Sequence, residues 1–118
     1  MGRKNETIGL GIKERFALLA VLPGQGNIMT LRVVRELREE LAPSGKEIKA
    51  FGIREEKEGN QKSIRWNPEK AKNKEIAIDD ARRSIVTEAL RKANKAEILT
   101  EDLIPLYERF VEKNYEEE

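Results

Sequence analysis

Apolar side chains recur at helical spacing along most of the chain. Over residues 12–21 they occupy positions i, i+4, i+7 and i+8, which is the stripe of an amphipathic helix. The stripe consists of Ile12, Phe16, Leu19 and Ala20. Because a proline disfavours helical geometry in the residue before it, we expect this helix to end before Pro23.

A second apolar stripe predicts a helix over residues 28–42 that ends before Pro43. Asn27 or Thr30 can accept hydrogen bonds from the first free amides of this helix. The side chains expected to be buried are Leu31, Val34, Leu37 and Leu41.

A third, short helix is predicted from the S-x-x-E spacing of a capping box, in which Ser44 and Glu47 each satisfy a backbone amide. The helix runs through Ile48 and Phe51. It ends at Gly52, which can adopt the left-handed conformation that closes a helix.

Residues 53–66 change from helical spacing to alternation, which predicts a β-hairpin with the turn dipeptide Gly59-Asn60. A two-residue loop sets the register so that four side chains share one face: Ile53, Glu55, Ile64 and Trp66. A short strand over residues 75–78 could add to the hairpin and make a three-stranded sheet.

Two further helices are predicted in the last third of the chain. The first spans about residues 80–92, with Asp79 as its cap. Thr100 can cap the second, and Pro105 lies so early in it that an irregular first turn is expected. The expected buried positions are Ala81, Ile85, Val86, Ala89, Leu90 and Ala93 in the first helix, and Leu103, Leu106, Tyr107, Phe110 and Val111 in the second.

The elements together predict one mainly helical α+β domain over residues 1–118. It would have about five helices with a small antiparallel hairpin or three-stranded sheet. Residues 1–10 are expected to be flexible, and residues 116–118 form an acidic tail. A hairpin that follows three helices also fits a winged-helix-like arrangement.

The amino-acid composition excludes several classes of function. The chain has no Cys and no His, which removes disulfides, thiolate metal sites and the usual general base near neutral pH. The acidic pairs Asp79/Asp80 and Glu101/Asp102 stand at expected helix starts, where capping explains them without a metal ion. We therefore expect no catalytic residues, no metal site, no cofactor and no small-molecule substrate.

No apolar run is long enough for a membrane span, and no signal peptide is visible, so we expect a cytoplasmic protein without membrane partners. Charge is unevenly distributed. Residues 1–74 carry 16 Lys/Arg against 10 Asp/Glu, or +6, while residues 75–118 carry 7 against 12, or −5. Two interpretations stay open: the halves attract one another, within the fold or in a dimer, or the basic half meets phosphate.

Seven cations make up the candidate contact surface for nucleic acid or a protein partner. They are Arg32, Arg35, Arg38, Arg54, Lys57, Lys62 and Arg65. The three on the second helix alternate with glutamates, which is typical of a solvated face. Trp66 could stack on a base if it were exposed, but its alternation with Ile64 favours packing in the core.

Several segments resemble small proteins of unassigned function in phage and prophage genomes. They are residues 13–19, Leu22-Pro23 with the glycine turn after it, 30–39, 64–67, 74–76 and 99–110. The likeness covers most of the chain, and its motifs are structural. It implies a phage context, and hence the cytoplasm of a host cell, without an activity or functional residues.

The preferred function is a small non-enzymatic accessory protein of phage type that contacts a protein partner, or itself, through exposed helix and hairpin surfaces. The alternative is a winged-helix-like DNA-binding protein that uses the basic N-terminal part and the hairpin.

Overall fold

The computed structural model of the chain describes residues 6–112, and it begins with strand β1 (Glu6–Leu10). This strand pairs antiparallel with β4 (Lys74–Ile78), with Ile8 opposite Ile76. Two predictions are therefore wrong: residues 6–10 are ordered in a strand, and the strand near residue 75 joins β1 instead of the hairpin. The physical reason is burial, because alternate apolar residues of both strands face the helices.

Helices α1 (Ile12–Val21) and α2 (Ile28–Leu41) follow β1. Each ends before a proline, as expected, and the residue between the helix and the proline has extended backbone. The side chain of Asn27 caps α2 by accepting a hydrogen bond from the amide of Thr30 at 2.8 Å. The expected buried residues Val34, Leu37 and Leu41 are in the core of the protein.

The buried face of α1 differs from the predicted stripe. Its fully buried residues are Ile12, Arg15 and Leu18, whereas Phe16 is half-buried and Ala20 is exposed. The prediction assigned the wrong face because it counted only apolar residues, whereas Arg15 occupies the centre of the buried face.

Helix α3 (Gly45–Phe51) starts with the predicted Ser44/Glu47 capping box and ends at Gly52, whose φ of 67° is left-handed. The hairpin consists of β2 (Arg54–Glu58) and β3 (Gln61–Arg65) in the predicted register, with Glu55 opposite Ile64. It forms a two-stranded sheet of its own.

Helix α4 (Asp80–Lys95) is capped by Asp79, as predicted. The C-terminal segment consists of a 3-10 turn η1 (Glu101–Leu103), helix α5 (Ile104–Tyr107) and a π-helical turn η2 (Glu108–Glu112). The irregular start predicted from Pro105 is confirmed, but Thr100 makes no side-chain cap. The acidic tail at residues 116–118 lies outside the described residues.

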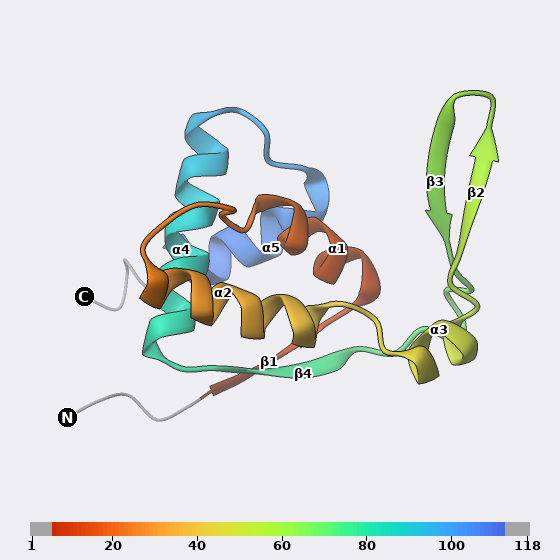
Figure 1. Cartoon of the computed structure of the whole chain (residues 1–118), viewed down its shortest axis with the longest axis horizontal. Helices are drawn as coiled ribbons and strands as arrows, with labels where there is room; N and C mark the ends of the chain where they lie inside the picture. The colour runs from red at the N-terminus through yellow and green to blue at the C-terminus, as the bar shows by residue number, and fades with distance from the viewer. Residues whose placement is uncertain (1–5, 113–118) are drawn as a thin grey trace.

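One apolar core joins the β1–β4 sheet, α1, α2, α4 and the C-terminal segment. Each fully buried Leu, Ile or Val in it contributes about 1.5–3 kcal/mol relative to an exposed one. Figure 1 shows the helices gathered over this sheet, while the hairpin stands clear of them beyond α3, with β3 nearer the helices and β2 on the outer side. None of the helices within residues 6–112 has the length and apolarity that crossing a membrane requires.

Candidate interaction groove

A groove lies between the hairpin and the helical body. It consists of two adjoining hollows of about 750 and 410 Å³, both of which are lined by Lys13, Ile64, Trp66 and Asp102. We call it the β3 groove. Each hollow has a volume within the usual range for a binding site.

The smaller hollow is mainly apolar. Helix α1 supplies one wall, and the loop between α4 and η1, together with η1 itself, supplies the opposite one. The apolar lining residues are Phe16, Ala17, Ala20, Val21, Ile64, Trp66, Ile98 and Leu103. Ile98 is 60% exposed and Ile64 is 45% exposed, so this apolar surface is accessible to a partner.

The larger hollow borders the edge of β3 and not one of its faces. Ser63, Ile64, Arg65 and Trp66 all line it. The first three belong to β3, and Trp66 directly follows it. Side chains alternate between the two faces of a strand, so a hollow that three consecutive strand residues line runs along the strand's edge. Among residues 6–112, β3 pairs only with β2, and its edge toward the groove therefore offers unpaired backbone N–H and C=O groups.

Trp66 connects the two hollows. Its ring lies 6.0 Å from the ring of Phe16, with 44° between the ring planes. Trp66 was predicted to pack in the core, but it is only half-buried and lies outside the main core cluster. It packs with one side on α1 and exposes the other to the groove.

The groove carries charges of both signs on different walls. Lys13 and Arg65 lie toward α1 and the hairpin, whereas Glu101 and Asp102 lie on the wall formed by η1. Glu14 also lines the larger hollow, but its carboxylate already accepts a hydrogen bond from the amide of Gly11 at 3.0 Å. A partner segment would therefore meet a basic side near β3 and an acidic side opposite it.

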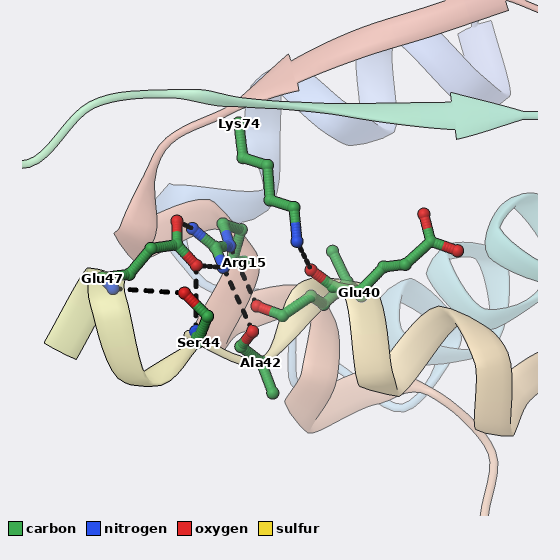
Figure 2. A network of polar contacts seen from close by, with 7 residues as sticks. Arg15, Glu40, Ala42, Ser44, Glu47 and Lys74 are labelled. Carbon is green, nitrogen blue, oxygen red and sulfur yellow. Dashed lines mark hydrogen bonds and ion pairs between the residues drawn. The ribbon is translucent and has the colours of Figure 1, made fainter.

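A buried arginine holds α3, and with it the hairpin, against the other helices. Arg15 is 0% exposed and donates from Nε to the carbonyl of Leu41 at 2.9 Å and from Nη2 to that of Ala42 at 3.2 Å. Its other bonds reach the carboxylate of Glu47 at 2.7 and 2.8 Å, in the forked geometry that arginine and carboxylate favour (Figure 2). Arg15 thus joins α1 to the end of α2 and the start of α3.

The C-terminal end of α2 is covered by cations. Lys74 donates from Nζ to the carbonyl of Glu40 at 2.7 Å, next to the two carbonyls bound by Arg15 (Figure 2). The last carbonyls of a helix lack partners within it and carry the negative end of its dipole. Positive side chains from α1 and β4 therefore satisfy this end and set the direction in which the chain leaves toward α3.

Hydrogen bonds from two arginines lower the pKa values of Glu47 and Glu40. The hydrogen bond from Arg15, opposed by burial and aided by the amide of Ser44, lowers the pKa of Glu47 from 4.5 to about 2. On the other side of α2, a hydrogen bond from Arg82 lowers the pKa of Glu40, and the same bond raises the pKa of Arg82. Both acids are charged at neutral pH and act as structural anchors.

The candidate cations on α2 have different environments. Arg38 donates to the carbonyls of Leu22 at 3.2 Å and Pro23 at 3.5 Å, so it closes the end of α1. Arg32 and Arg35 are exposed. Figure 1 places α2 within the helical body and the hairpin beyond α3, so these cations belong to two separate parts of the fold.

The four hairpin cations lie on two faces. Arg54 and Arg65 both contact the carboxylate of Glu56, at 3.0 and 3.5 Å. Lys57 and Lys62 are directly opposite one another on the other face. The first pair is partly neutralised, while the second is an opposed pair of like charges.

The sequence did not reveal Arg15 or the groove. An arginine at helical spacing from Ile12 and Leu18 was the available signal, but most such arginines are solvated. The groove depends on three segments that only the fold brings together. Comparison of the chain with family models, with curated proteins and with solved structures gives no match.

Proposed function

We propose that this chain is a small non-enzymatic binding protein that holds an extended segment of a partner protein in the β3 groove. The observation that carries the proposal is the position of the groove along the unpaired edge of β3, beside an accessible apolar hollow. A strand added to an exposed sheet edge gains main-chain hydrogen bonds, and neighbouring hollows select its alternate side chains.

Each part of the groove has a role in this binding. The edge of β3 would pair with the backbone of the segment. The hollow between Phe16, Ala20 and Ile98 would take an apolar side chain that points toward the helices. Glu101 and Asp102 favour a basic side chain at the other end of the segment, because they face it across the groove from β3.

The resemblance to phage proteins adds a setting to the proposal. A small accessory protein of a phage would meet its partner in the cytoplasm of the host cell. The proposed mode of binding does not depend on that setting, since it rests on the groove alone.

Trp66 gives a direct assay, because it is the single tryptophan of the chain and it lines both hollows. Peptides selected from a random display library on the protein would be titrated against it while Trp66 emission is recorded. We expect saturable binding that Ile98→Lys weakens by at least about tenfold, because a charge in an apolar hollow must be desolvated.

Ile28→Lys provides the matched control. Ile28 is 61% exposed on α2, close to the 60% of Ile98, and it lies outside the groove. It should leave the affinity unchanged. If no peptide is selected, or if both variants bind the selected peptides as the unmodified protein does, the proposal is wrong.

DNA binding is the second candidate, and one observation favours it: the hairpin presents four exposed cations on a projecting two-stranded ribbon, a shape that a major groove admits. The same ribbon carries Glu55, Glu56 and Glu58, which would repel phosphates. We therefore place it second to binding of a protein segment.

A further inference from the structure

The outer edge of β2 is a second unpaired strand edge, independent of the groove. Its two-stranded sheet contains only β2 and β3 within the described part of the chain, and Figure 1 shows β2 on the side away from the helices. A two-stranded hairpin is marginally stable in water, and an open edge is a template for another strand. The helices in Figure 1 lie on the opposite side of the hairpin, next to β3.

The charges along β2 are self-complementary. In order they are those of Arg54, Glu55, Glu56, Lys57 and Glu58. A second copy that lies antiparallel and is centred on Glu56 would place its Glu58 opposite Arg54 and its Lys57 opposite Glu55. By two-fold symmetry each pair occurs twice, so every charged pair except the central one joins opposite signs.

We propose that two copies of this chain associate through β2, in antiparallel register about Glu56, to form a four-stranded sheet of order β3-β2-β2-β3.

The central pair of glutamates is compensated within each copy. The Glu56 carboxylate lies 3.0 Å from Nε of Arg54 and 3.5 Å from Nε of Arg65. In the dimer, the two carboxylates on the axis would therefore be surrounded by four guanidinium groups. Their mutual repulsion is offset on the same face of the sheet.

The second copy also compensates a repulsion that the single chain contains. Lys57 lies directly opposite Lys62 in the hairpin, and like charges in this position destabilise a strand pair. In the proposed register, Glu55 of the second copy flanks Lys57 on its other side, on the same face. The lysine would then lie between one like charge and one opposite charge.

Neighbouring registers have fewer opposite-sign pairs. Centring the pair on Lys57 would place the two lysines opposite each other and each Glu56 opposite Glu58 of the second copy. Centring it on Glu55 would also place two glutamates opposite each other, and it would keep only the two pairs of Arg54 with Glu56 of the second copy, against four opposite-sign pairs in the register about Glu56. The register about Glu56 is thus selected by charge, and it leaves both β3 grooves open at the outer edges of the sheet.

Sedimentation equilibrium on the full chain tests the proposal. The unmodified protein should approach twice the 13.6 kDa of one chain as concentration rises. Glu55→Lys and Lys57→Glu should each raise the dissociation constant at least about tenfold, because each makes two cross-strand pairs like-charged. Lys57→Glu also places an acid opposite Lys62, so a loss of dimer cannot come from a weaker hairpin.

Charge restoration is the stronger arm of the test. An equimolar mixture of Glu55→Lys and Lys57→Glu should form a mixed dimer, and the double variant Glu55→Lys/Lys57→Glu should dimerise again, since opposite charges then face each other. Lys46→Glu, an exposed change of equal charge on α3, should dimerise as the unmodified chain does. A monomer at all concentrations, or single variants that dimerise normally, or a mixture that stays monomeric would overturn the proposal.

Discussion

Replacing Arg15 by methionine should destabilise the protein more than any surface change, although no apolar contact is lost. Methionine keeps the length and the apolar stem of the side chain but removes the guanidinium. Glu47 then loses its buried partner, and the carbonyls of Leu41 and Ala42 lose their donors. The arm formed by α3 and the hairpin would be held less firmly to α1.

The magnitude follows from these contacts. Removing one partner of a buried ion pair costs about 3–5 kcal/mol, because the other charge stays behind without compensation. The side chain of Glu47 is 18% exposed and keeps the amide of Ser44 as a donor at 3.0 Å, so we take the lower end of that range. The expected loss is about 3 kcal/mol, against a total stability of about 5–15 kcal/mol for a typical domain.

Urea denaturation followed by circular dichroism measures this loss at pH 7. Glu47→Gln should cost a similar amount, about 3 kcal/mol, because it leaves the fully buried Arg15 charge without a counterion, although the amide oxygen can still accept a hydrogen bond from Arg15. The double variant should cost clearly less than the sum of the two single changes, since both remove the same pair. A loss below about 1 kcal/mol for Arg15→Met, or additive losses, would refute the assigned role of this pair.

The same pair makes a pH-dependent contribution with a definite sign. The pKa of Glu47 is lowered to about 2 in the folded protein, from 4.5, so its contribution is full above pH 4.5 and is lost as the pH falls toward 2. The shift corresponds to about 3 kcal/mol at most, and contact of the carboxylate with water reduces the expected loss to about 2 kcal/mol. Denaturation midpoints between pH 5 and 2 should therefore fall less steeply in Glu47→Gln, and equal slopes would contradict this account.

Three further predictions concern other parts of the chain. Gly52→Ala should lower the free energy of unfolding by about 1 kcal/mol in urea denaturation, because the φ of 67° at this position is unfavourable for alanine. Gly45→Ala, at the start of α3, is the control and should be neutral, because its new Cβ would meet no atom within 4 Å. Equal effects of the two changes would show that the left-handed backbone at Gly52 is not the cause. Glu40→Gln should lower the free energy of unfolding by less than about 1 kcal/mol in the same assay, because the Glu40 side chain is 40% exposed and water screens its ion pair with Arg82. A loss above about 2 kcal/mol would contradict this screening. Filter retention of duplex DNA by the protein should be weak even at low salt. The DNA-binding alternative would be favoured by strong retention that falls steeply with added salt and is lost in the double variant Lys57→Ala/Lys62→Ala.

Local signals in the sequence determined most helix boundaries and the hairpin. The caps at Asn27, Ser44 and Asp79 and the left-handed Gly52 each depend on atoms within a few residues, so the sequence alone predicts them. The register of the hairpin follows from its two-residue turn in the same way. These elements were predicted because their energetics are local.

Strand β1 shows where such signals end. It is five residues long and contains Gly9, and its stability comes from pairing with β4 and from burying Ile8 and Leu10 under the helices. The pairing partner of Ile8 is Ile76, far away in the sequence. Nothing near residues 6–10 indicates that partner, because strand pairing is a long-range contact.

The sequence by itself therefore determined a mainly helical α+β domain with a mixed-charge hairpin, since periodicity, caps and turns are encoded over short distances. Only the tertiary structure decided that Arg15 is buried, that Trp66 divides its surface between α1 and a groove, and that β3 faces the helices while β2 faces away. Each of these depends on which distant segments pack together. The same sequence pattern would allow a solvated arginine, a core tryptophan and a third strand on the hairpin, and packing of the whole chain selects among them.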